Sequence, residues 1–151
     1  PTQPPLGIST RRLTRLNAVQ ALYQHQLSGD NIEFIISQFT SNTSKVYAGT
    51  GKALNPDLDF FKELVLGTQE HLLPINQDIS DHLSAGWHLE RVSVVTLSIL
   101  KLAIYELRYH LLTPTPVIIN EYIEITKDFF EEKEVAFVNG ILDVIAKKYR
   151  R

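Results

Sequence analysis

The sequence predicts an all-α fold of about seven helices, and three observations support that prediction. Apolar residues recur at steps of three and four along most of the chain, which is the period of a helix with one buried face. No two alternating segments are joined by a hairpin turn, so we predict no sheet. The chain has 151 residues, of which 44% are hydrophobic and 21% charged, a size and composition typical of one globular domain.

The first half of the chain is divided by capping and helix-breaking residues. Thr10 can cap a first helix, and Ser28-Gly29-Asp30 can stop it. A segment rich in Ser, Thr, Asn and Gly follows the second helix and is predicted as a polar loop. The predicted elements are a flexible tail over residues 1–10, a helix from Thr10 to about Leu27, a short helix over 31–39 and a loop over 40–56.

The second half contains the most apolar segment. Val92, Val94 and Val95 alone would favour a strand, but about twenty residues that continue at helical spacing favour a buried helix. Pro114 and Pro116 end that helix. The predicted helices run from Asp57 to about Leu73, from Pro74 to Gly86, from Glu90 to Leu112, from Val117 to Phe129 and from Glu131 to Tyr149.

The last of these helices contains an unusual Asn139-Gly140 pair. Such a pair often marks a turn, yet the apolar period runs through it from Val138 to Ile145. A glycine inside a helix costs about 1 kcal/mol relative to alanine. We therefore predict that the helix continues through the pair and that a neighbouring helix packs close to Gly140, so that Gly140→Leu destabilises the fold by overpacking. The alternative is a surface role for Phe137 and Asn139.

Several classes of function lack the residues they need. The chain has no cysteine, which excludes disulfides, thiolate nucleophiles and Cys-based zinc sites. The stretch 49–52 resembles half of a phosphate loop, but Val46 and Ala53 stand where that motif needs glycine and Ser or Thr. Charges interrupt the apolar stretch 92–112, so no membrane span is predicted. No apolar signal segment opens the chain, and we expect a cytoplasmic protein.

Two pairs of polar residues have a spacing that could serve chemistry. Asp78 and His82 lie four apart, but no third ligand has matching spacing, so a solvated helical pair is preferred to a metal site. Glu124 and Asp128 form an acidic pair without a nucleophile motif, and we interpret them as a polar outer face. The residues therefore predict no enzyme, no metal and no cofactor.

Basic residues gather at the two ends of a chain whose net charge is only −2. Arg11 and Arg15 lie about 40° apart around the predicted first helix, with Arg12 beside them. Guanidinium groups suit phosphate oxygens, and the ring of Tyr23, further along the same helix, could stack on a base. Arginines at a helix end are often only solvated, so charge alone leaves both interpretations open.

Four blocks of sequence follow one another between residues 11 and 143 in a recognisable order. They are Arg11-Arg12-Leu13-Thr14-Arg15 with Ala18-Val19-Gln20-Ala21-Leu22-Tyr23, Leu100-Lys101-Leu102-Ala103-Ile104-Tyr105-Glu106-Leu107, Pro116-Val117-Ile118-Ile119-Asn120-Glu121, and Phe137-Val138-Asn139-Gly140-Ile141-Leu142-Asp143. Together they resemble the bacterial NusB family of transcription antitermination factors. The resemblance covers nearly the whole chain except the loop 40–56.

The resemblance implies an all-α fold of two small helical bundles, which we place at residues 11–73 and 74–151. It also implies a protein without catalysis that binds boxA-type single-stranded RNA together with NusE, a ribosomal small-subunit protein. The complex would work with RNA polymerase in ribosomal RNA transcription. By the same resemblance, three residues are phosphate contacts and two more lie at or near the RNA surface: Arg11, Arg12 and Arg15, then Tyr23 and Phe137.

The chain departs from the family pattern where RNA binding is concerned. Leu13 and Thr14 occupy a stretch that is usually more basic, and Lys101 stands where arginine is common. Fewer arginines predict weak RNA binding by the isolated chain and stronger binding once NusE is present. An acidic patch also precedes Phe137, formed by Glu131, Glu132 and Glu134.

The resemblance also indicates where NusE would bind: the later helices, around Tyr105-Glu106-Leu107, are the expected side.

Two rival functions remain open. The fold also resembles the N-terminal domain of certain RNA cytosine methyltransferases, in which case catalysis would need a second domain. A helical protein-interaction module that does not bind RNA is the third alternative.

Overall fold

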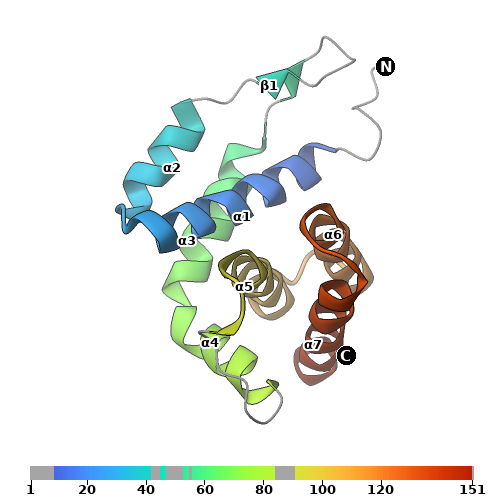
Figure 1. Ribbon diagram of the computed structural model, residues 1–151. Helices are drawn as coiled ribbons and strands as arrows, with labels where there is room; N and C mark the ends of the chain where they lie inside the picture. The colour runs from blue at the N-terminus through green and yellow to red at the C-terminus, as the bar shows by residue number, and fades with distance from the viewer. Residues whose placement is uncertain (1–8, 42–44, 47–52, 55, 84–90, 151) are drawn as a thin grey trace. The chain divides into compact units, whose positions relative to one another are not determined.

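The computed structural model describes residues 9–41, 45–46, 53–54, 56–83 and 91–150. Within these ranges the chain forms seven helices and one pair of very short strands (Figure 1), which confirms the predicted all-α class. The helices are α1 (Thr10–Ser28), α2 (Ile32–Ser41), α3 (Leu58–Glu70), α4 (Leu72–Asp81), α5 (Val94–Tyr109), α6 (Thr115–Phe129) and α7 (Glu132–Tyr149). The chain divides into two compact units, Pro1–Val65 and Leu66–Arg151. This boundary falls inside α3, whereas we expected it after residue 73.

The first unit is organised around α1. The Ser9 side chain caps this helix by accepting from the Arg12 backbone N–H at 3.0 Å, so the cap lies one residue before the predicted Thr10. Gly29 ends the helix in the left-handed region with a φ of 73°, a conformation that glycine adopts without steric cost. α2 packs against α1. The core of this unit includes Ala18, Val19, Leu22, Ile35, Phe61 and Leu64.

A short antiparallel pair lies in the segment that we predicted as a loop without a hairpin. β1 (Lys45–Val46) pairs with β2 (Ala53–Leu54), with Lys45 opposite Leu54 and Val46 opposite Ala53. The absence of a hairpin was therefore a wrong prediction. Strands of two residues are too short to show the alternation by which a strand is recognised in a sequence.

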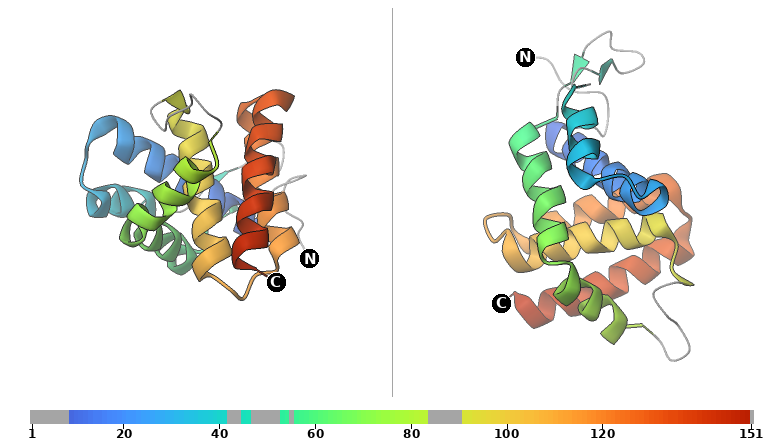
Figure 2. Two further views of the ribbon diagram at one scale, coloured as in Figure 1. Left: turned by 90° about the horizontal axis from the view of Figure 1, so that it is seen from below. Right: turned by 90° about the vertical axis from the view of Figure 1, so that its left-hand side faces the viewer.

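The second unit is built on α5, which contacts α4, α6 and α7. Figure 2 shows α5, α6 and α7 side by side. The helix predicted from Glu90 begins instead at Val94, because the Ser93 hydroxyl accepts from the Thr96 N–H at 3.1 Å and caps it. The helical interpretation of the valine-rich stretch is confirmed. Side chains along α5 form the centre of this unit, including the fully buried Ile99, Leu100, Ile104 and Leu107.

Asp78 of α4 is not the solvated residue that we predicted. Its side chain is buried, and its carboxylate accepts from Arg108 Nη1 at 2.9 Å and from the Tyr149 hydroxyl at 2.7 Å. It therefore joins α4 to α5 and to the end of α7. The other pair, Glu124 and Asp128, does lie in a polar setting, since the Glu124 carboxylate forms a salt bridge with the Lys127 ammonium at 2.9 Å.

Groups of metal ligands and membrane-spanning helices are both absent from the part of the chain that the structure describes. Among residues 9–41, 56–83 and 91–150, no three His, Asp or Glu side chains are grouped so that they could hold a metal ion. Among the helices that the structure describes, none is both long enough and apolar enough to cross a membrane.

α7 runs unbroken through Asn139-Gly140, as predicted. The predicted close packing is wrong, because a Cβ built at Gly140 meets no atom within 4 Å and the residue is exposed. The apolar period places Val138, Ile141 and Leu142 in the core, and Gly140 lies on the opposite side of the helix. Periodicity showed correctly that the helix continues but not which way this position faces.

The exposure of Gly140 reverses the expected effect of Gly140→Leu. We expect the free energy of unfolding to stay unchanged or to rise by up to about 1 kcal/mol, because leucine is the better helix former and meets no neighbour. Urea unfolding followed by circular dichroism measures the change. A loss of more than about 1 kcal/mol would indicate the overpacking that the open surface excludes.

Candidate nucleic-acid interface

The three predicted arginines lie at the start of α1 but differ in exposure. Arg11 is exposed, Arg12 is half-buried, and Arg15 is only 3% exposed. The guanidinium carbons of Arg11 and Arg15 lie 4.0 and 5.2 Å from the ring centroid of Phe60, which is itself buried. Two cations and one aromatic ring of α3 therefore form a single cluster, with Arg11 on its solvent side.

Tyr23 lies on α1 at a distance from this cluster. It lies twelve positions after Arg11, which corresponds to about 18 Å along the helix axis. Its side chain is partly exposed and lines a shallow groove with Gln20, Leu27 and Phe39. The ring is open to solvent on α1, but it belongs to a different part of that helix from the arginines.

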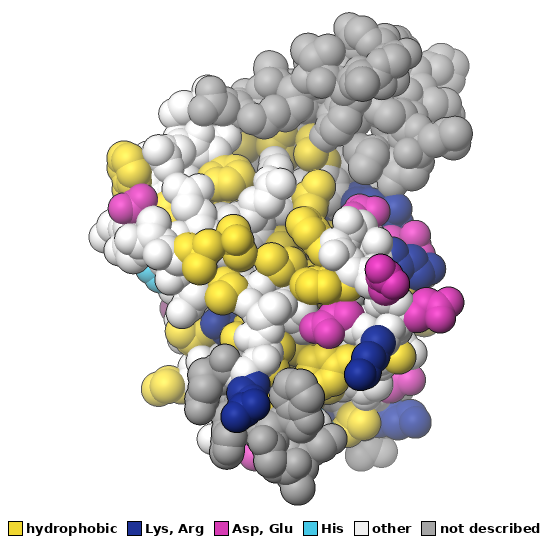
Figure 3. Space-filling view, in the orientation of Figure 1, with side chains coloured by type: hydrophobic (Ala, Val, Ile, Leu, Met, Phe, Trp, Pro, Cys, Tyr) yellow, Lys and Arg dark blue, Asp and Glu magenta, His cyan; other side chains and the backbone are white. Residues whose placement is uncertain are grey.

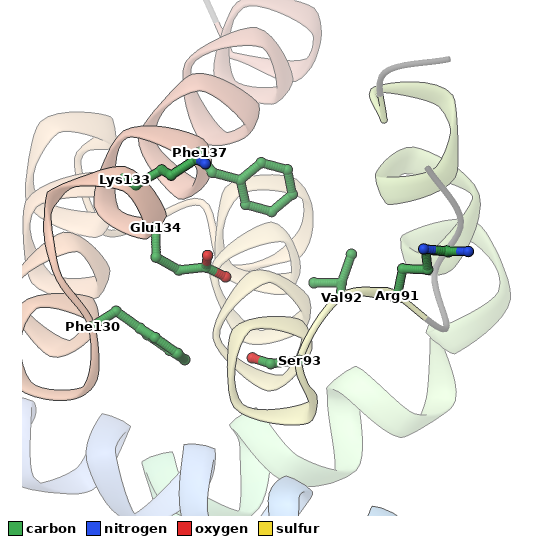
Figure 4. Close-up of a pocket in the computed structure, with 7 residues that line it drawn as sticks. All are labelled: Arg91, Val92, Ser93, Phe130, Lys133, Glu134 and Phe137. Carbon is green, nitrogen blue, oxygen red and sulfur yellow. The ribbon is translucent and has the colours of Figure 1, made fainter. Parts of the chain in front are cut away.

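Phe137 lines a pocket of about 430 Å³ in the second unit. Figure 4 shows its ring with the side chains of Phe130 and Glu134, opposite Val92 and Ser93 of the segment that leads into α5. Two cationic residues complete the wall, Arg91 and Lys133. Aromatic rings beside cations are the combination that binds unpaired bases and their phosphates.

The acidic patch before Phe137 is not uniform. Glu134 is held in the pocket wall, because the Thr96 hydroxyl donates to its carboxylate at 2.6 Å, whereas Glu131 and Glu132 are exposed. Figure 3 shows acidic and basic side chains interspersed on the side of the view where α6 and α7 lie. This face of the second unit carries a mixture of charges rather than a continuous acidic surface.

Four residues of the arginine cluster and of the Phe137 pocket were not predicted from the sequence: Phe60 in the cluster, and Arg91, Phe130 and Lys133 in the pocket. Lys133 lies one helical turn before Phe137, so its position beside the pocket could have been derived from helical spacing. Phe60 and Arg91 reach their places only through the packing of separate elements, and no local pattern points to them.

The block expected to face NusE lies in the core. Tyr105 is 7% exposed, and Glu106 and Leu107 are fully buried. The Glu106 carboxylate accepts from the Tyr122 hydroxyl at 2.5 Å, which links α5 to α6. These three residues support the fold and are not themselves available for a partner. Lys101, on the same helix, is partly buried, and burial lowers the pKa of its ammonium group.

Comparison with known proteins gives one consistent result. Residues 12–147 match the model of the NusB family. The transcription antitermination protein NusB of Caulobacter vibrioides is 38% identical over 143 residues, which is 95% of this chain and 96% of the relative. The NusB protein of Clostridium botulinum is 38% identical over 138 residues, 91% of this chain and 98% of the relative.

Solved structures agree with the sequence relatives. T. maritima NusB superposes with a TM-score of 0.78 at 34% identity and covers 99% of this chain and 96% of its own. The crystal structure of the antitermination factors NusB and NusE in complex with double-stranded RNA gives a TM-score of 0.76 at 25% identity, over 93% of this chain and 98% of the other. Matching sequence and fold along most of its length, this chain belongs to the NusB family.

Proposed function

We propose that this chain is a cytoplasmic transcription antitermination factor without catalytic activity, which binds boxA-type single-stranded RNA together with NusE. The observation that carries the proposal is the family match over residues 12–147, which includes Arg12 and Arg15 of α1 and begins directly after Arg11. A NusB relative of the same fold has been crystallised with NusE and double-stranded RNA. This chain and NusE then act with RNA polymerase in ribosomal RNA transcription.

The proposed RNA surface combines phosphate contacts with stacking positions. Arg11, Arg12 and Arg15 supply the positive charge of α1, and Arg11 offers its guanidinium to solvent. Phosphate contacts of this kind hold the strand in place but distinguish few sequences. Tyr23 and Phe137 offer aromatic rings, which stack on bases that are not paired. Single-stranded RNA is therefore expected to bind more tightly than a duplex of the same sequence.

The triple variant Arg11→Ala, Arg12→Ala, Arg15→Ala tests the phosphate contacts. Each neutralised phosphate contributes about −0.7 to the slope of log affinity against log salt for a single strand. Arg11 and Arg12 reach solvent, whereas Arg15 is buried, so losing the contacts of the first two should flatten the slope by about 1.4 and weaken different RNA sequences about equally. The measurement is a titration with boxA-like RNA at several salt concentrations, with and without NusE.

A second variant separates stacking from charge in the same experiment. Tyr23→Ala should weaken single-strand binding by roughly 1 to 3 kcal/mol and leave the salt slope unchanged. Wild-type protein should bind RNA more tightly when NusE is present. If the triple variant keeps the full slope, α1 does not contact phosphates and the proposed RNA surface is wrong.

The relatives favour this function over the two alternatives. The C. vibrioides and C. botulinum relatives, which match over most of this chain, carry the antitermination name rather than a methyltransferase name. The interaction-module alternative predicts normal NusE binding with no RNA affinity, either alone or in the complex. The titration with and without NusE distinguishes that outcome from the proposed one.

A further inference from the structure

The aromatic ring beneath the cationic end of α1 belongs to a different helix. Phe60 lies in the first turn of α3 and is 4% exposed. The Arg11 guanidinium carbon is 4.0 Å from its ring centroid, within the range of a favourable cation–π contact, and the Arg15 guanidinium carbon is 5.2 Å from it. Arg11 is exposed, so its guanidinium faces both the ring and solvent.

A chain of hydrogen bonds fixes the ring relative to α1. The Asp57 backbone N–H donates to the Thr14 hydroxyl at 2.9 Å, and that hydroxyl donates to the Thr10 carbonyl at 2.7 Å. The Asp57 carboxylate in turn accepts from the Phe60 N–H at 3.1 Å and caps α3. Thr14 lies between Arg11 and Arg15 in the sequence of α1, so the residue bonded to the start of α3 belongs to the same turn of α1 as both arginines.

We propose that Phe60 is a positioning residue for RNA binding, which holds the Arg11 guanidinium in the orientation that meets a phosphate of the bound strand. This inference rests on the proposed RNA-binding function. An exposed arginine side chain that rotates freely loses conformational entropy when it binds a phosphate. A ring that already restricts the guanidinium reduces that loss. Arg15, on the same ring, keeps the cluster positive from a buried position.

This role differs from a direct RNA contact. Phe60 is too buried to offer a face to a base, so its effect on RNA must pass through Arg11. Removal of the ring should weaken binding without changing the number of phosphates that are neutralised. Affinity should fall while the salt slope stays constant, whereas Arg11→Ala should lower the affinity and flatten the slope by about 0.7.

The test compares Phe60→Leu, Phe60→Tyr and Arg11→Ala in titrations with single-stranded boxA-like RNA. Phe60→Leu keeps an apolar side chain but removes the ring, and we expect it to weaken binding roughly three- to tenfold. Phe60→Tyr keeps the ring and should restore affinity to within about twofold of wild type. In an Arg11→Ala background, Phe60→Leu should cost less than about twofold, because the group that the ring positions has gone.

Phe61→Leu is the matched control. Phe61 is the next residue of α3, is also buried, and packs against Phe39 with ring centroids 5.4 Å apart. The same substitution there should lower the melting temperature but leave RNA affinity unchanged at a temperature where every variant is folded.

The outcomes separate this inference from the proposed function. If Arg11→Ala changes neither affinity nor slope, the α1 phosphate site and the role of Phe60 both fail. If Arg11→Ala weakens binding but Phe60→Leu does not, or if the two effects simply add, only the positioning role fails. Equal losses in Phe60→Leu and Phe61→Leu would also overturn it, since they would reflect a weakened helix pair rather than a positioned arginine.

Discussion

Replacing Arg150 by alanine is expected to lower the free energy of unfolding by about 3 kcal/mol. Arg150 follows the last residue of α7, and its guanidinium donates to backbone carbonyl groups at the end of α5 and in the turn before α6. The acceptors, at 2.7 to 3.0 Å, are the carbonyl oxygens of Glu106, Leu107, His110 and Thr113. A cation at the C-terminal end of a helix is also favoured by the helix dipole.

Denaturant unfolding of Arg150→Ala and two companion variants measures this effect. Arg150→Lys should recover only a small part of the loss, since a lysine ammonium cannot reproduce the planar fork that reaches several carbonyls at once. Lys147→Ala removes a cation from the exposed side of the same helix and should change stability by less than about 0.5 kcal/mol. Similar losses in Arg150→Ala and Lys147→Ala would mean that charge, and not the carbonyl contacts, is responsible.

Local patterns predicted most of the helices but not this contact. The glycine that ends α1 and the prolines at the start of α6 are visible in the sequence, because each acts within a few residues of its own position. Arg150 was visible only as part of a basic C-terminus. Its acceptors lie 37 to 44 positions earlier, and no local rule connects residues so far apart.

The same limit explains which part of the candidate site could be predicted. Helical spacing placed Arg11 and Arg15 on one face of α1, and both meet the same ring. The ring itself and the burial of Arg15 depend on how α3 packs on α1. A cation at a helix end is solvated unless another element covers it, and the covering element is a tertiary feature.

Two glycines, Gly140 and Gly67, show that the helical period of apolar residues does not reveal which positions pack against a neighbour. The sequence singled out Gly140, but among the glycines that the structure describes it is Gly67 of α3 that meets a close neighbour. A Cβ built there would overlap the phenol ring of Tyr105, because the Cβ would lie closer to the ring atoms than real Cβ atoms lie to their neighbours. Tyr105 is 7% exposed and lies beside His71 and Tyr109, whose rings stack with centroids 3.9 Å apart. The phenol ring therefore has little room to move.

Gly67→Leu is accordingly expected to lower the free energy of unfolding by about 3 kcal/mol, even though leucine is the better helix former by about 1 kcal/mol. The loss arises because the new side chain must displace the Tyr105 ring and disturb the stack of His71 on Tyr109. Urea unfolding measures it, with Gly140→Leu as the matched control, since the same substitution on the exposed side of α7 should be neutral or stabilising. Tyr105→Ala should rescue part of the loss in the Gly67→Leu background by removing the ring that clashes. If Gly67→Leu and Gly140→Leu are equally stable, or if Tyr105→Ala gives no rescue, the phenol ring is not what requires glycine at position 67.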